Sequence, residues 1–145
     1  NMSKQYKTIL VPVDGSDASL KALDRAIELA KFYTSKLVIA HVIDVRSYSL
    51  AIAYREPLEE YAEDNAKKIL ADAEQKAKDA GITDVATLKK EGSPRSVIAK
   101  KIAPEVNADL IVMGATGYGM VERMFVGSVS ESTVRHSTCD IMIVR

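Results

Sequence analysis

The sequence predicts an α/β fold, in which an open five-stranded parallel sheet carries helices on both faces. Two observations lead to this prediction: strand-like segments alternate with helical segments along the 145 residues, and the strand-like segments are near-continuous apolar runs. Unbroken apolar strands are typical of parallel sheets, because helices cover both of their sides. A chain of this length with 47% hydrophobic residues suffices for one ordinary domain, so we expect a single domain over residues 1–145.

The first part of the chain is expected to form a strand, a helix and a second strand. Lys7–Asp14 is apolar and rich in β-branched residues, and it ends in the turn sequence Asp-Gly-Ser-Asp, which predicts a buried strand and a turn. Ser16 suits the N-cap of a helix that apolar residues at helical spacing extend to about Tyr33. Lys36–Asp44 predicts a second buried strand.

A connection without clear periodicity and a long helix follow. Val45–Pro57 has no clean repeat and is predicted to be irregular. Apolar residues recur at helical spacing from Leu58 to Ala77, which predicts a long amphipathic helix. Gly81 is a natural residue to end that helix, since glycine readily adopts the left-handed conformation found there.

The third strand is expected nearer a sheet edge, because Val85–Glu91 is more polar than the other strands. Ser93 as N-cap and Pro94 at the first helical position predict the start of the next helix. Pro104 is expected to break or kink that helix, because proline lacks an N–H group and its ring clashes with the preceding turn.

The last part of the chain is predicted to hold two strands and one helix. Leu110–Gly114 is apolar throughout and predicts the fourth strand. Ser128–His136 predicts a helix, and Ile141–Val144 predicts the fifth strand.

Two common phosphate-binding patterns do not fit the glycine-rich stretch between the fourth strand and this helix. Gly114 and Gly119 have the spacing of a P-loop, but Met120 stands where its lysine belongs. Gly117 and Gly119 begin a dinucleotide-binding fingerprint, but Glu122 stands at its third glycine. The stretch therefore lacks the parts that the most direct route to phosphoryl transfer uses.

A third pattern fits this stretch. Gly114, Gly117, Gly127 and Ser128 form G-x2-G-x9-G-[ST], which resembles the nucleotide-binding motif of the universal stress protein family. Gly114 and Gly117 are expected to let the backbone approach a ligand without a Cβ clash. Gly127 and Ser128 open a helix, whose free N–H groups and dipole favour anions. The spacing by itself is equally compatible with a simple strand-to-helix connection.

The resemblance to universal stress proteins extends over nearly the whole chain. It is carried by the segments Lys7–Ser19, His41–Asp44, Gly92–Pro94, Ala108–Gly119 and Val126–Arg145. It implies the strand order 3-2-1-4-5 of an adenine nucleotide alpha hydrolase-like fold. That order reverses between the first and fourth strands, which is where open α/β sheets bind ligands.

The resemblance also implies a set of ATP-binding residues. They are Pro12, Asp14, Val42, Met113, Gly114, Gly117, Gly127, Ser128 and Val129. Asp14 is expected to contact the ribose or to help hold Mg²⁺ through Mg-ATP, and its alternative role is that of a turn residue that caps the next helix. Val42 is expected to meet the adenine through its backbone.

Other residues near the motif have less specific roles. Arg123, the only cation of the loop, either reaches a phosphate or is solvated. Thr116 stands where the family often has a basic or polar residue, which predicts the loss of a polar or charged contact to the ligand. His41 lies in an apolar strand and is expected to belong to the core. No Cys/His/Asp cluster in the sequence has the spacing of a metal site.

Composition argues against two classes of function. The 20 basic and 20 acidic residues balance, and no basic cluster carries interleaved aromatic residues, which argues against nucleic-acid binding. No apolar stretch approaches the length of a membrane-spanning helix, so no membrane role is expected. The lone Cys139 excludes an intramolecular disulfide and, with no signal peptide visible, favours a cytoplasmic protein.

The function that these features favour is an ATP-binding regulatory protein of the universal stress type. The family resemblance implies a homodimer that pairs the strand at residues 141–145 across a two-fold axis. The alternative is an enzyme on the same fold, a slow ATPase or nucleotidyl transferase, for which the motif offers no lysine and no obvious base. A phosphorylation-dependent receiver ranks last, because the third strand does not end in aspartate.

Overall fold

The computed structural model describes residues 5–44, 55–116 and 127–145. Its centre is a five-stranded sheet in which every neighbouring pair is parallel and the order is β3-β2-β1-β4-β5. The strands are β1 (Thr8–Pro12), β2 (Lys36–Asp44), β3 (Val85–Gly92), β4 (Leu110–Gly114) and β5 (Asp140–Val144). The predicted fold class and strand order are therefore confirmed, as is the outer position of the third strand.

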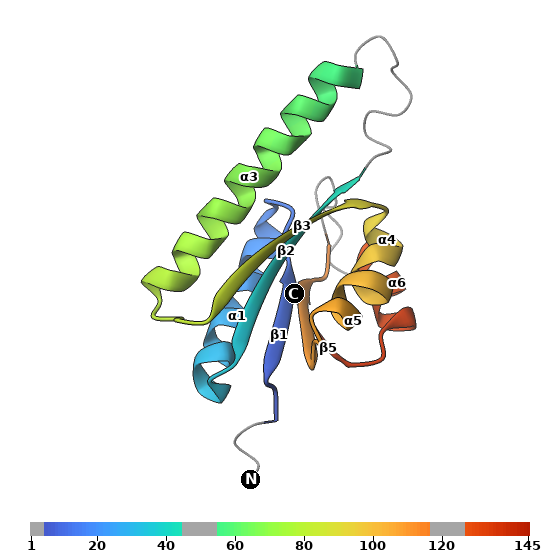
Figure 1. Cartoon of the computed structure of the whole chain (residues 1–145). Helices are drawn as coiled ribbons and strands as arrows, with labels where there is room; N and C mark the ends of the chain where they lie inside the picture. Colours follow the sequence, from blue (N-terminus) through green and yellow to red (C-terminus); the bar gives the residue numbers. More distant parts are fainter. Residues whose placement is uncertain (1–4, 45–54, 117–126) are drawn as a thin grey trace.

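Helices cover both faces of this sheet (Figure 1). On one face lie α1 (Asp17–Tyr33) and α3 (Arg55–Asp79). On the other lie α4 (Pro94–Val97), the π-helical turn η3 (Ile98–Ile102), α5 (Ala103–Glu105) and α6 (Ser128–His136). No helix in the described parts of the chain is long and apolar enough to span a bilayer.

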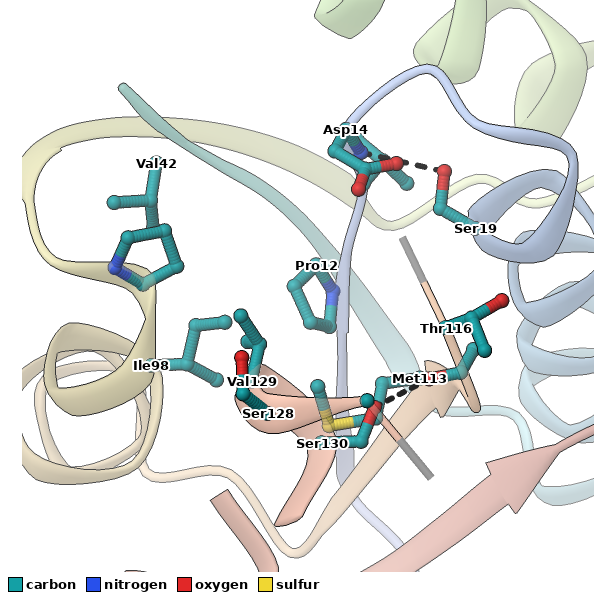
Figure 2. A pocket seen from close by; sticks show the side chains of 14 residues that line it. Pro12, Asp14, Ser19, Val42, Ile98, Met113, Thr116, Ser128, Val129 and Ser130 are labelled. Atoms are coloured by element: carbon teal, nitrogen blue, oxygen red, sulfur yellow. Dashed lines mark hydrogen bonds between the residues drawn. The ribbon is translucent and has the colours of Figure 1, made fainter. Parts of the chain in front are cut away.

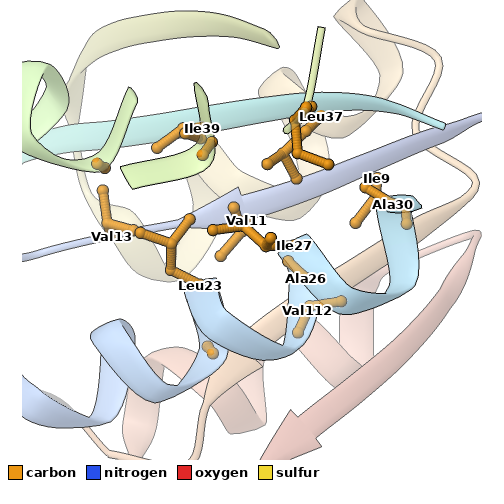
Figure 3. Close-up of a cluster of buried hydrophobic side chains, with 14 of the residues drawn as sticks. Ile9, Val11, Val13, Leu23, Ala26, Ile27, Ala30, Leu37, Ile39 and Val112 are labelled. Atoms are coloured by element: carbon orange, nitrogen blue, oxygen red, sulfur yellow. The ribbon is translucent and has the colours of Figure 1, made fainter. Parts of the chain in front are cut away.

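Successive side chains of the central strands pack alternately into two separate hydrophobic cores, one on each face of the sheet. Figure 3 shows Leu23 and Ile27 of α1 against Val11 of β1 and Ile39 of β2, all within the core of the α1 face. Leu10, one residue before Val11, belongs to the core of the opposite face. Strands buried on both sides in this way require the unbroken apolar runs seen in the sequence.

Two predicted helix ends are confirmed by their hydrogen bonds. Ser16 is the N-cap of α1, and its Oγ accepts from the backbone N–H of Ser19 at 3.2 Å. Beyond α3, the N–H of Gly81 donates to the carbonyl of Lys78, and the N–H of Ile82 donates to that of Ala77. This pair of bonds, with a φ of +98° at Gly81, is a Schellman cap.

The long helix begins earlier than its apolar spacing predicts. It starts at Arg55, so the last three residues of the segment predicted to be irregular are helical, and that part of the prediction is wrong. Pro57 lies in the first turn, where its missing N–H would have had no helical acceptor in any case. Residues 45–54 of that segment lie outside the described residues.

Of the break or kink expected at Pro104, the break does not occur, because the helical backbone continues to Glu105. A π-helical turn precedes the proline, in which the N–H of Ala103 donates to the carbonyl of Ile98, five residues back. The N–H of Val106 then donates to Ile102 at 3.0 Å. The wider turn lets the chain accommodate one residue that has no N–H group.

One side-chain hydrogen bond joins the segment before β1 to the start of β5, and it should make the stability of the fold fall with pH in the alkaline range. The hydroxyl of Tyr6 donates to Asp140 at 2.8 Å, and this bond raises the pKa of Tyr6 above its ordinary value of 10.0. Because the protonated phenol makes the bond, its contribution is present below pH 10 and is lost as pH rises through the raised pKa.

We therefore expect wild type to lose more stability than Tyr6→Phe between pH 9 and pH 11.5, as measured by urea unfolding at each pH. The phenylalanine variant keeps the edge-to-face contact that the ring makes with Tyr33 at 5.2 Å. Parallel loss of stability in both proteins would show that the hydroxyl contributes nothing.

Candidate functional site

A cleft of about 330 Å³ lies at the carboxyl ends of β1 and β4, where the strand order reverses (Figure 2). The predicted site residues that line it are Pro12, Asp14, Val42, Met113, Gly114, Gly127, Ser128 and Val129. Gly117 and Arg123 lie outside the described residues. The cleft opens because β1 and β4 pair only through Ile9 and Leu10 and then separate.

The N-terminus of α6 provides backbone donors at this cleft. Its N-cap is Gly127, which has no side chain to cap the helix, and the N–H of Gly127 itself donates to the carbonyl of Ala115 at 2.6 Å. The next three N–H groups, those of residues 128–130, have no hydrogen-bond acceptor among the described residues. Free N–H groups at the positive end of a helix are suited to bind an anion.

The backbone of Val42 provides a further hydrogen-bond donor. Val13 donates its N–H to the carbonyl of Ala40 at 2.8 Å, and a continued parallel ladder would next join the N–H of Val42 to the carbonyl of Val13. That bond is absent from the described structure, in which the pairing of β1 with β2 stops at Pro12 and Ala40. Val42 therefore presents an unpaired N–H group to the cleft.

Asp14 forms the turn between β1 and α1. Its Oδ1 accepts from the N–H of Ser16 at 2.9 Å, while Ser16 rather than Asp14 caps the helix. The turn role foreseen for Asp14 is thus present, although the capping role is not. Its Oδ2 has no hydrogen-bond partner in the described part of the chain, so one carboxylate oxygen remains available at the cleft.

The described walls of the cleft are largely apolar, and the one charge among them is negative. Figure 2 shows Pro12, Val42, Ile98 and Met113 around the opening. Asp14 is the only ionisable residue among the described residues that line it. The described parts of the chain also contain no cluster of three or more His, Cys, Asp or Glu residues that would hold a metal ion. A metal at this site would therefore need most of its ligands from a bound molecule or water.

Comparison with known proteins identifies the family of this chain. The model of the universal stress protein family matches residues 5–145. A putative universal stress protein of Staphylococcus aureus is 46% identical over 97% of this chain and 84% of its own length. The chain belongs to the universal stress protein family.

Solved structures of the family share the fold. Universal stress protein UspA from Lactobacillus plantarum aligns with a TM-score of 0.87 at 29% identity, over 97% of this chain and 98% of its own. A universal stress protein solved in complex with cAMP aligns with a TM-score of 0.75 at 35% identity, over 97% of this chain and 98% of its own.

In this universal stress protein, the packing of β4 against α1 leaves no room for a side chain at Gly114, the first glycine of the motif. A Cβ built on Gly114 would lie 2.8 Å from the backbone carbon and oxygen of Ala18 in α1. The absence of a side chain at Gly114 is therefore required by the packing of β4 on α1. The expected approach of a ligand at this glycine stays a prediction. At Gly127, a Cβ would lie 3.2 Å from the carbonyl oxygen of Ala115.

Two buried serines that line the cleft were not predicted from the sequence. Ser130 is 3% exposed, and its Oγ donates to the carbonyl of Gly114 at 2.6 Å, which ties α6 to the end of β4. Ser19 donates to the carbonyl of Ser16 at 3.0 Å and accepts from the N–H of Asp14 at 3.3 Å. The remaining residues that line the cleft without having been predicted are Val13, Pro94, Ile98 and Thr116. Only the repeated serine in Gly-Ser-Val-Ser hinted at Ser130.

Proposed function

We propose that this universal stress protein binds ATP, together with Mg²⁺, in the cleft at the carboxyl ends of β1 and β4. The observation that carries the proposal is that the uncapped N–H groups of α6 and the unpaired N–H of Val42 border the same cleft. The N–H groups of α6 suit a phosphate, and the N–H of Val42 suits the edge of a base. The cleft volume also falls within the roughly 300–1,000 Å³ of small-molecule sites.

The backbone of Val42 suits adenine better than guanine. Adenine carries an amino donor next to a ring-nitrogen acceptor, which complements a main-chain carbonyl and N–H. Guanine carries a carbonyl acceptor in place of that amino group, so the same backbone would meet it with unpaired groups. Pro12 and Ile98 offer apolar surface for the base. The solved family member in complex with cAMP supports an adenine nucleotide as the ligand class.

The phosphates require a partner of positive charge. Among the described lining residues, only the N-terminus of α6 offers one, and Asp14 opposes it. Mg²⁺ prefers oxygen ligands and usually binds one or two carboxylates together with substrate phosphates and water. The free Oδ2 of Asp14 fits that role. Bound Mg²⁺ would supply neutralisation of the phosphate charge, while the chain itself would hold the nucleotide.

We further propose that the protein acts as a nucleotide-dependent regulatory homodimer. β5 is an edge strand of the sheet, and its residues Ile141–Ile143 are only partly buried. An apolar strand edge invites pairing with another strand, and antiparallel pairing with a second copy would cover it. Nucleotide binding would alter the surface offered to other proteins only if ATP binds two states of the protein with different affinity.

The test is to purify the protein without added nucleotide, denature it, and identify the released small molecules by chromatography and mass spectrometry. We expect an adenine nucleotide in near-stoichiometric amount or, if the purified protein is empty, saturable uptake of added Mg-ATP. Incubation with ATP should then yield little ADP. Rapid protein-dependent ADP formation would favour the enzyme alternative over a binding protein.

Replacing Asp14 with asparagine should uncouple ATP binding from Mg²⁺. Asparagine keeps an oxygen for the N–H of Ser16, so the turn remains, but it removes the charge. We expect affinity for Mg-ATP to fall about tenfold, or ~1.4 kcal/mol, and affinity for ATP in EDTA to rise. Calorimetric titrations with and without Mg²⁺ measure both. An unchanged ratio of the two affinities would show that Asp14 plays no part in metal binding.

A further inference from the structure

His41 occupies a buried position next to the unpaired amide of Val42. It lies in β2, is 8% exposed, and was expected from the sequence to belong to the core. Its Nδ1 lies 2.7 Å from the carbonyl oxygen of Val13. Since a carbonyl oxygen can only accept, the imidazole must carry its proton on Nδ1 and donate it to Val13.

The carbonyl that His41 binds is the one that the β1–β2 ladder would otherwise offer to Val42. Leu37 and Ile39 of β2 belong to the core of the α1 face, and Val38 and Ala40 belong to that of the opposite face. By the same alternation, the ring of His41 projects to the α1 face of the sheet. A carbonyl that meets this ring at 2.7 Å is turned out of the plane in which strands pair.

We propose that His41 is a positioning residue that keeps the backbone N–H of Val42 free to bind the adenine base. The imidazole holds the Val13 carbonyl toward the α1 face of the sheet, so the β1–β2 ladder ends one hydrogen bond early. The N–H of Val42 is then left unpaired at the cleft. This inference rests on the proposed function for its ligand. The early end of the β1–β2 ladder is a property of the ligand-free protein and does not depend on which ligand binds.

Two substitutions separate the hydrogen bond from the volume of the ring. His41→Phe fills a similar space and donates nothing, so the Val13 carbonyl is released to accept from Val42. His41→Asn places an amide N–H at the same number of bonds from Cβ as Nδ1, and it should restore the bond to Val13.

A matched control exists at the other end of the same ladder. The Oγ of Ser35 is buried and donates to the carbonyl of Tyr6 at 2.5 Å. Ser35→Ala therefore removes a side-chain bond to a β1-side carbonyl, far along the strand from the cleft. It reports what a general loss of stability does to ligand binding.

The first measurement is amide hydrogen exchange of the nucleotide-free protein, followed by NMR. In wild type, the amide of Val42 should exchange at least about tenfold faster than that of Ala40, because only the latter lies within the β1–β2 ladder. His41→Phe should slow Val42 about tenfold relative to wild type, while His41→Asn and Ser35→Ala should leave it fast. A Val42 amide that is protected in wild type, or unchanged in His41→Phe, would overturn the inference.

The second measurement is titration with Mg-ATP and with magnesium tripolyphosphate, which has phosphates but no base. His41→Phe should weaken ATP binding about tenfold and leave tripolyphosphate binding unchanged, and His41→Asn should bind ATP within about threefold of wild type. Equal losses for both ligands, or no recovery in His41→Asn, would contradict the role in base binding. Wild type that binds neither ligand contradicts the proposed function and the base-binding role, whereas the exchange result still decides the effect on the ladder.

Discussion

Ser128→Asp is expected to abolish ATP binding at ordinary nucleotide concentrations while making the protein slightly more stable. Ser128 is exposed and is the first residue of α6, beside the uncapped N–H groups. A carboxylate there interacts favourably with the positive end of the helix, by about 0.3–1 kcal/mol. The same charge repels a phosphate within a few ångströms by roughly 2–4 kcal/mol, which corresponds to a loss of about 100-fold or more in affinity.

Opposite signs for stability and binding make this prediction discriminating. Urea unfolding measures the first quantity, and titration with Mg-ATP measures the second. Ser128→Asn is the control, because it has nearly the same shape without the charge and should retain most of the affinity. If Ser128→Asp bound ATP within about threefold of wild type, phosphate binding at the N-terminus of α6 would be excluded.

Gly114→Ala is expected to destabilise the fold strongly for so small a change. The added methyl would lie 2.8 Å from backbone atoms of Ala18 and 3.0 Å from its Cβ, so α1 and β4 must move apart. Overpacking of this kind costs about 1–3 kcal/mol. Since the contact is with backbone, no change of side-chain rotamer relieves it. A chain of this size should lose roughly 2–4 °C in Tm for each kcal/mol.

Thermal and urea unfolding of Gly114→Ala beside Gly127→Ala tests this explanation. At Gly127, the nearest atom to the added methyl is 3.2 Å away and φ is −64°, so the cost should stay below about 1 kcal/mol. Equal stability losses in the two variants, or an unfolding free energy for Gly114→Ala within about 0.5 kcal/mol of wild type, would show that the contact with α1 is not what requires glycine there.

The sheet could be predicted from the sequence because its determinants are local. The central strands are unbroken apolar runs, as in Lys36–Asp44, and such a run by itself predicts burial on both faces of the sheet. The helix ends at Ser16 and Gly81 depend on hydrogen bonds to backbone groups within a few residues, so they could also be predicted from the sequence. The strand order came from the resemblance to universal stress proteins, because local periodicity does not define which strands are neighbours.

The features that could not be predicted depend on atoms far apart in the chain. Gly114 is required by Ala18, which lies nearly a hundred positions earlier. The bonds from Ser130 to Gly114 and from His41 to Val13 join residues of different elements. Such contacts leave no periodic signal in the sequence. The π-helical turn before Pro104 could not be predicted for a different reason, since the proline by itself suggested only a break or kink in the helix.

The most direct test of adenine-nucleotide binding is a calorimetric titration of nucleotide-free protein with Mg-ATP, with Mg-GTP as the comparison. We predict one saturable ATP site per chain and weaker binding of GTP by at least about tenfold, because the backbone of Val42 complements adenine. No saturable heat up to millimolar Mg-ATP, or equal affinity for the two nucleotides, would contradict it.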